Sequence, residues 1–187
     1  MSGTLSKEVS KLRALQTLVL SNNSFQGTIP FDSLAFTSLE YLALSSNAFS
    51  GSISDAIRDM KALRYMYLDS NEKIAGELPV ALGGAENLRS INLDYTAVSG
   101  RVPAVIGRLR NLEYLSMQGC KLQGSIPGEI NLLTNLKTLN LDSNALTGEL
   151  PNLARMTSLS SLMLVGNRLR GRIEDSFADL RSLGKCR

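Results

Sequence analysis

The chain has 187 residues, of which 43% are hydrophobic and 20% are charged, and its formal net charge is +3. This balance is that of an ordinary globular domain, and no apolar run approaches the roughly 18 residues of a membrane-spanning helix. Because the sequence contains no histidine, catalytic triads and histidine-bearing metal sites are excluded. No glycine-rich phosphate loop is present either. We therefore expect no enzyme activity and no cofactor.

The most regular feature is a repeat in which a strand-like LxxLxL run is followed by NxLxGxIP or a close variant. The first full copy runs from Leu15 to Leu20 as LQTLVL and from Asn23 to Pro30 as NSFQGTIP. Later copies begin at Leu39, Leu63, Leu88, Leu112, Leu136 and Leu159, in steps of 23 to 25 residues. A period in this range predicts a leucine-rich-repeat solenoid.

Each LxxLxL run predicts a strand whose last two leucines face inward, because residues two apart in an extended chain point to the same side. The first inward column is Leu18, Leu42, Met66, Ile91, Leu115, Leu139 and Leu162, and the second is Leu20, Leu44, Leu68, Leu93, Met117, Leu141 and Leu164. The few apolar side chains of one unit contribute roughly 1.5–3 kcal/mol each. Ordering its backbone costs roughly 1–2 kcal/mol per residue. We therefore expect stability to come from stacking between neighbouring units.

The residues after each strand predict the remaining turns of the coil. Asparagine occupies the inward turn at Asn23, Asn47, Asn71, Asn144 and Asn167, where its amide can bond the backbone of adjacent units. Thr96 and Cys120 replace it, and we expect these two rungs to be weaker. Glycine four or five residues later permits positive φ at a second corner. Proline then ends the hydrogen-bond ladder, and one or two helical turns follow.

The complete prediction is an α/β, right-handed leucine-rich-repeat solenoid with a parallel concave β-sheet and short helical or 3-10 segments on the convex side. Residues 1–187 form one domain of about seven repeats, with partial repeats at both ends. Neither end resembles the polar capping repeat that a solenoid requires. We therefore expect an excerpt of a longer array, with any targeting signal outside it.

The two cysteines are not expected to form a disulfide. Cys120 and Cys186 lie about three strands apart, which is about 14 Å at the usual strand spacing. A disulfide tolerates Cα separations only up to about 7 Å. Cys120 is predicted to be a buried thiol that acts as a small apolar residue.

The LxGxIP element resembles the plant-type leucine-rich repeats of receptor-like kinase ectodomains, receptor-like proteins and polygalacturonase-inhibiting proteins. The resemblance covers residues 1 to 183, but the matching positions are scaffold positions. It implies an extracellular or cell-surface parent protein, for which the sequon Asn22-Asn23-Ser24 is suitable, although the cysteine-paired caps of the family are missing here. Contact with a membrane would come only through parts of the parent outside this chain.

Outward strand positions face the concave side, where solenoids bind partners. Four tyrosines occupy these positions and Tyr95 follows at a strand end, whereas the inward leucine positions contain none. Tyrosine is favoured in strands in general, but that preference does not explain the one-sided placement. We predict a concave binding site for a protein or peptide, formed by Tyr41, Tyr65, Tyr67, Asp69, Asn92, Asp94 and Tyr114.

The tyrosines are the expected apolar anchors, and Asp69 and Asp94 are expected to orient a basic or hydroxyl-bearing ligand. These two carboxylates should lie about 5 Å apart on adjacent strands, which is close to the separation in retaining glycosidases. An open concave sheet neither encloses a substrate nor excludes water, so we reject a hydrolase. Calcium would need six to eight oxygens, and Asn92 and Asp142 do not complete such a shell.

Two hypotheses of different class remain. The first is a ligand-sensing module of a receptor-like or defence-type protein. The second is an adhesion, polysaccharide-binding or ice-binding protein that uses a regular lateral face. The relevant lateral column is Thr28, Ser52, Glu77, Arg101, Ser125, Glu149 and Arg172. Its charged and mixed character favours the first hypothesis. The basic residues Arg168, Arg170 and Arg172 have no interleaved aromatics, so nucleic acid is not an expected partner.

Overall fold

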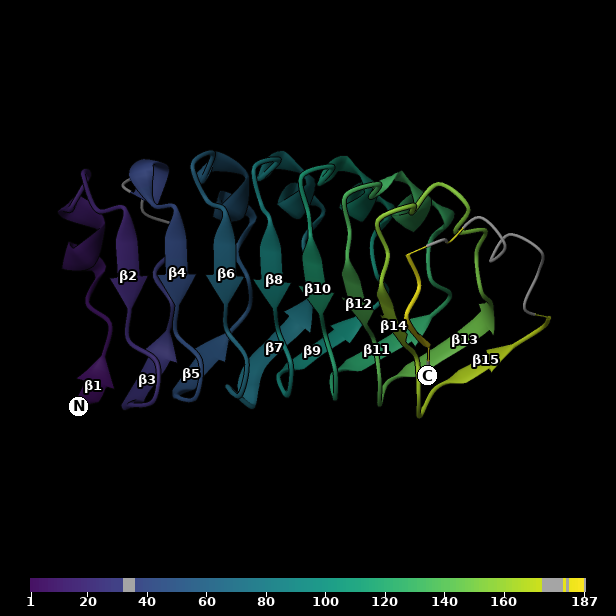
Figure 1. Cartoon of the computed structure of the whole chain (residues 1–187). Helices are drawn as coiled ribbons and strands as arrows, with labels where there is room; N and C mark the ends of the chain where they lie inside the picture. Colours follow the sequence, from purple (N-terminus) through teal and green to yellow (C-terminus); the bar gives the residue numbers. More distant parts are fainter. Residues whose placement is uncertain (32–35, 173–179, 181, 187) are drawn as a thin grey trace.

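The computed structural model describes residues 1–187 except 32–35, 173–179, 181 and 187, and it shows coils stacked side by side along one axis (Figure 1). One sheet contains the LxxLxL strands. Its strands are β2 (Thr17–Val19), β4 (Tyr41–Ala43), β6 (Tyr65–Tyr67), β8 (Ser90–Asn92), β10 (Tyr114–Ser116), β12 (Thr138–Asn140), β14 (Ser161–Met163) and β16 (Lys185–Cys186). All of its pairings are parallel, and each strand follows the preceding one by one repeat. The stacking of the units is therefore as predicted.

The register of this sheet aligns the inward leucines. Leu42 pairs with Leu18 on one side and with Met66 on the other. From Leu42 to Leu162 these side chains are at most 2% exposed, whereas Leu18 and Leu20 of the first full repeat and Leu164 of the last are half-buried. The two predicted inward columns are thus one continuous hydrophobic core, confirmed by the structure.

A second parallel sheet, which the sequence analysis did not anticipate, follows the asparagine turn of each coil. Its strands are β1 (Ser2–Thr4), β3 (Ser24–Thr28), β5 (Ala48–Gly51), β7 (Lys73–Glu77), β9 (Ala97–Gly100), β11 (Lys121–Gly124), β13 (Ala145–Glu149) and β15 (Arg168–Arg170). In Figure 1 these arrows run obliquely below the first sheet. The repeat glycines have positive φ, as predicted; Gly27 has φ 81°. The strands up to β13 nevertheless extend to the glycine or past it, so the corner comes later there, whereas β15 ends just before Gly171.

The asparagine ladder is confirmed. The Asn47 side-chain amide donates to the carbonyls of Leu20 at 2.9 Å and Leu44 at 3.0 Å, and its oxygen accepts the Phe25 N–H at 2.9 Å. The fully buried Asn71 repeats this pattern one coil later. Each asparagine therefore ties its own strand end to the preceding coil and satisfies polar backbone groups that are shielded from water.

The two departures from the ladder bond differently, and they contact each other: the Thr96 hydroxyl oxygen lies 3.4 Å from the Cys120 sulfur. The Thr96 hydroxyl donates to the Leu93 carbonyl at 2.8 Å, and the Cys120 thiol donates to the same carbonyl at 3.2 Å. Neither side chain carries the second N–H of an amide. That these rungs are weaker remains a prediction. Both cysteines are free thiols, with Cys120 buried and Cys186 exposed, as the analysis of their separation predicted.

Short 3-10 helices form the opposite side of most coils, as expected, whereas residues 150–160 form turns there instead. The helices are η1 (Lys7–Lys11), η2 (Phe36–Ser38), η3 (Asp55–Asp59), η4 (Val80–Gly84), η5 (Ala104–Arg108) and η6 (Gly128–Leu132). Pro79, Pro103 and Pro127 are the residues immediately before their helices, where a missing N–H costs nothing. Among the described residues, no helix is long and apolar enough to cross a membrane.

A second asparagine ladder lies at the start of the LxxLxL strands. The exposed side chains of Asn87, Asn111 and Asn135 donate to the carbonyls of Lys61, Glu86 and Arg110 at 2.8, 3.0 and 2.8 Å. The sequence analysis missed this ladder, although an asparagine before the first leucine recurs in these three repeats. These bonds tie the helical side of one coil to the next.

Candidate binding face

The concave face consists of the outward positions of the first sheet, and three tyrosines form an aromatic cluster on it. Tyr41 and Tyr65 are paired residues on β4 and β6, and Tyr67 is two residues further along β6. The ring centroids of Tyr41 lie 5.4 Å from Tyr65 and 5.6 Å from Tyr67, and those of Tyr65 and Tyr67 lie 6.5 Å apart. All three side chains are half-buried. Separations and tilts in this range are those of favourable aromatic pairs.

Tyr114 lies outside this aromatic cluster, because the small Ser90 separates it from Tyr65 in the same register column. Ser90 is 7% exposed, so its side chain projects less from the sheet than the half-buried Tyr65 and Tyr114 on either side. Asn92, in the neighbouring column, accepts the Asp94 N–H at 3.0 Å. The Asn92 side-chain oxygen therefore stabilises the turn after β8 and already accepts one hydrogen bond from within the chain.

Three carboxylates form an acidic row along the strand ends, at Asp69, Asp94 and Asp142. Asp69 accepts the Ser45 hydroxyl at 2.7 Å, and Asp142 accepts the Val165 N–H at 2.6 Å. Asp94 accepts both the Ser116 hydroxyl and the Gln118 N–H at 2.6 Å. Every one of these donors is neutral. The carboxylates are fixed in position by the scaffold without being neutralised by it.

The electrostatics of Asp94 reflect this arrangement. Burial raises the pKa of its carboxyl group, the bonds from Ser116 and Gln118 oppose the shift, and the charges of Asp69 and Asp142 add to it. Burial also raises the pKa of the Tyr114 phenol, with Asp94 and Asp69 contributing to the shift. Tyr114 therefore lies close enough to Asp94 and Asp69 to interact with their charges.

Tyr95 occupies an unexpected position at the edge of the concave face. Its φ is 55°, in the left-handed region that bulky residues rarely adopt. Its side chain is 52% exposed. A Cβ placed on Gly119 would come within 2.8 Å of the Tyr95 ring, so the ring lies directly on that glycine. Sequence reasoning left its direction open, although the equivalent residues Asn22, Gly119 and Gly166 are of types that favour positive φ and could have indicated this turn.

Replacing Tyr95 by asparagine is expected to raise the free energy of unfolding by about 0.5–1 kcal/mol. Asparagine tolerates the left-handed region better than tyrosine does, and Asn22 already occupies the equivalent turn of its repeat with φ 58°. Urea unfolding followed by circular dichroism measures the change. Tyr95→Phe keeps the strain and should leave the midpoint unaltered. A lower midpoint for Tyr95→Asn would show that the ring's contact with Gly119 outweighs the strain.

The lateral column of the alternative hypothesis is exposed at all seven positions. It lies at the ends of the second sheet, just after each glycine, and it mixes hydroxyl groups with both signs of charge. Surfaces that bind by regular repetition need the same chemistry on every rung. This column does not offer it.

Comparisons with known proteins agree with the geometry. A family model described as leucine rich repeat matches residues 13–72, and a second model of the same description matches residues 111–133 and 135–155. No curated protein sequence matches the chain. Among solved structures, the plant peptide hormone receptor RGFR1 in complex with RGF2 is 33% identical with a TM-score of 0.97. The match covers 99% of this chain and 30% of the receptor chain.

Two further structures show how widely this coil is used. The Arabidopsis receptor kinase HAESA, in complex with the peptide hormone IDA and the co-receptor SERK1, is 31% identical with a TM-score of 0.92, over 96% of this chain and 30% of that one. A plant ice-binding protein is 22% identical with a TM-score of 0.85, over 99% of this chain and 60% of that one, and this likeness shows the fold alone. The chain thus spans about a third of the length of the receptors that it matches. It belongs to the leucine-rich-repeat family, with plant receptor ectodomains among its structural neighbours.

Proposed function

We propose that this chain is a peptide- or protein-binding module that holds its ligand on the concave face, and that it is not an enzyme. The observation that carries the proposal is the aromatic cluster of Tyr41, Tyr65 and Tyr67, whose rings lie half-buried on an open sheet. Tyrosine supplies a rigid apolar surface and a polar tip at low entropic cost, which is why it anchors many recognition surfaces.

The surroundings of the cluster support this role. Of the residues next to it, Ala43 and Ser90 are small and buried, and Asn92 is polar and half-buried. The aromatic rings are thus the largest apolar features of the central strands. Two structural neighbours, RGFR1 and HAESA, were solved in complex with peptides. A peptide that crosses the strands would meet one new outward side chain about every 4.8 Å.

The proposal extends to the cellular setting. The receptor neighbours include plant membrane receptor kinases whose leucine-rich-repeat ectodomains have been solved. We place the parent of this chain at the cell surface or outside the cell, where the sequon at Asn22 could receive a glycan. Asn22 is exposed. In this setting the module senses an extracellular ligand, and parts outside this chain transmit the signal.

The test is peptide selection against the concave face. Displayed peptides of random sequence are selected on the wild-type chain, and the affinity of each selected peptide is then measured for Tyr65→Ala/Tyr67→Ala. We expect a loss of at least about 100-fold, because truncated aromatic anchors dominate interface energies. The matched control is Leu12→Ala/Val80→Ala, which removes two exposed apolar side chains outside the concave face. It should leave the affinity unchanged.

Far-UV circular dichroism must show that both double variants keep the fold. If the selected peptides bind Tyr65→Ala/Tyr67→Ala as tightly as the wild type, the concave face is not the binding face. Equal losses in the two double variants would mean that the peptides recognise exposed apolar surface in general, which also contradicts the proposal.

A further inference from the structure

Among the described residues, no ion pair involves the acidic row of Asp69, Asp94 and Asp142. The ion pairs of the described residues involve Glu8, Asp55, Glu40 and Glu113, and those of Glu40 and Glu113 lie at the starts of the first-sheet strands. Glu113 is the clearest contrast, since it is flanked by Arg89 at 3.7 Å and Lys137 at 2.6 Å. A hydrogen bond from Lys137 is the main cause that lowers the pKa of Glu113. Asp69, Asp94 and Asp142 have only neutral donors.

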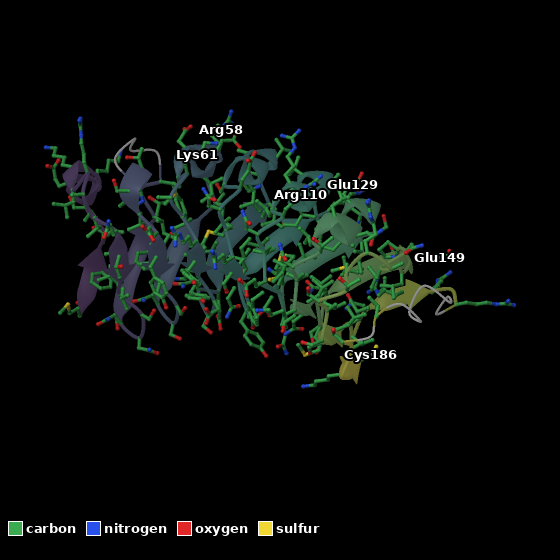
Figure 2. The ribbon with its side chains drawn as sticks, turned by 45° about the horizontal axis from the view of Figure 1, so that its top comes forward. Arg58, Lys61, Arg110, Glu129, Glu149 and Cys186 are labelled. Carbon is green, nitrogen blue, oxygen red and sulfur yellow. The ribbon has the colours of Figure 1, made fainter. Side chains whose placement is uncertain are left out.

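From β2 to β14 the cations next to the first sheet precede its strands: Arg64, Arg89 and Lys137 come just before β6, β8 and β12 and pair with Glu40 or Glu113. The outward positions of these strands, and the positions two residues beyond them, carry three aspartates and no lysine or arginine. Yet the whole chain has a net charge of +3. The excess of cations lies elsewhere, for example at Arg58, Lys61 and Arg110 on the helical side (Figure 2). Separation of charge on this scale directs oppositely charged partners to one face.

The aromatic cluster adjoins the acidic row. Tyr67 precedes Asp69 by two residues at the end of β6, so both side chains point to the same side of the sheet. Tyr114 lies within electrostatic range of Asp69, Asp94 and Tyr67. Aromatic faces attract ammonium and guanidinium groups within about 6 Å of the ring centroid. A carboxylate beside such rings adds a strong, directional hydrogen-bond acceptor.

We propose that the concave face takes an extended peptide segment bearing arginine or lysine side chains, whose cationic groups lie between the aromatic cluster and the acidic row. This inference rests on the proposed function and adds the chemical class of the ligand. Charge complementarity carries it, because a basic side chain would supply the missing counter-ion to carboxylates that the scaffold holds in place. Arginine suits the site best, since its planar group both stacks on aromatic rings and forms paired bonds to a carboxylate.

The geometry also sets the spacing of the basic residues. Asp69 and Asp94 lie on adjacent strands, about 4.8 Å apart, and Asp142 lies two further strands away, about 10 Å beyond. Same-side residues of an extended peptide recur about every 6.6 Å. Two basic residues separated by two to four positions along the peptide can therefore reach two carboxylates of the row.

Protonation couples to this binding. Burial raises the pKa of Asp94, and Asp69 and Asp142 raise it further, against the hydrogen bonds from Ser116 and Gln118. A cation beside Asp94 favours the ionised form and lowers this pKa. Binding therefore releases a proton wherever free Asp94 is partly protonated. Affinity for a basic peptide is expected to fall as the pH decreases through the pKa of free Asp94.

The experiment uses peptides selected on the wild-type chain, resynthesised with and without their positive charge. We expect the selected sequences to be enriched in arginine and lysine. Replacing arginine by citrulline, which keeps the shape and removes the charge, should lower affinity by about 10-fold or more. Raising NaCl from about 50 to about 500 mM should weaken binding of the charged peptide much more than that of its citrulline counterpart.

The protein variants complete the test. Asp69→Asn/Asp94→Asn keeps the acceptor oxygens for Ser45, Ser116 and Gln118 and removes both charges, so it should fold normally and lose about 10-fold or more in affinity for the charged peptide. Glu129→Gln removes an exposed acid on η6, on the helical side of the coil, and should leave affinity unchanged.

The two proposals fail in different ways. If the selected peptides depend on Tyr65 and Tyr67 but are not basic, or bind Asp69→Asn/Asp94→Asn as tightly as the wild type, the inference about charge is wrong and the proposed function stands. If no selected peptide depends on Tyr65 and Tyr67, both proposals fail together.

Discussion

Replacing Phe49 by alanine is expected to lower the free energy of unfolding by about 3–5 kcal/mol. The Phe49 side chain is fully buried and stacks on Phe25, with ring centroids 6.1 Å apart and an interplanar angle of 7°. It lies on β5 of the second sheet and points into the core. Removing the ring leaves a cavity between two coils that the packed leucines around it cannot close. A loss of this size is a large part of the stability of an ordinary domain.

Phe25→Ala is the matched control, because Phe25 occupies the equivalent position one coil earlier and is only half-buried. Because Phe25 buries less apolar surface on folding than Phe49 does, we expect its replacement to lower the free energy of unfolding by only about 1–2 kcal/mol. Urea unfolding monitored by circular dichroism measures both variants. Equal losses at the two positions would contradict the burial gradient along the solenoid.

The repeat made most of the scaffold predictable from sequence. Residues two apart in an extended chain must share a side, and a fixed period must place equivalent residues next to one another. The pairing of Leu42 with Leu18 and Met66 follows from these two facts alone. The asparagine bonds were predictable as well, because an inward turn leaves backbone groups that only a small bifunctional side chain can satisfy.

The second sheet was not predictable in the same way. The odd-numbered strands β1 to β15 that form this sheet are three to five residues long. Most of them contain or end at a glycine with positive φ. Isolated segments of this kind resemble turns. They become strands only because the preceding coil presents a partner in register, as Phe49 pairs with Gly27. This information lies in the stacking of units rather than in any one segment.

The candidate binding face was also predictable only in part. The sequence placed Tyr41, Tyr65 and Tyr67 on one side of the sheet, because period-two alternation determines the side. It did not show that the three rings contact one another, which depends on rotamers. It also missed that Ser116 and Gln118 hold Asp94, since these donors come from a different coil. The strained conformation of Tyr95 could be inferred only from the other repeats, where Asn22, Gly119 and Gly166 occupy the same turn.

Replacing Asn71 by alanine is expected to lower the free energy of unfolding by about 2–4 kcal/mol. The Asn71 side chain is fully buried, and its amide donates to the carbonyls of Leu44 at 3.0 Å and Leu68 at 2.9 Å. Its oxygen accepts the Phe49 N–H at 3.0 Å. Alanine leaves this donor and these acceptors in the core without their partner, and each unsatisfied buried group costs about 1–3 kcal/mol.

Two variants separate this effect from a general loss of hydrogen bonds. Asn71→Cys introduces the residue found at position 120, whose thiol donates to one carbonyl, and it should lose less than Asn71→Ala. Asn135→Ala removes a single bond from an exposed side chain and should cost less than about 1 kcal/mol, because water replaces the amide. Hydrogen exchange at the Phe49 amide gives the decisive measurement. Unchanged protection of that amide in Asn71→Ala would show that the asparagine ladder does not join one coil to the next.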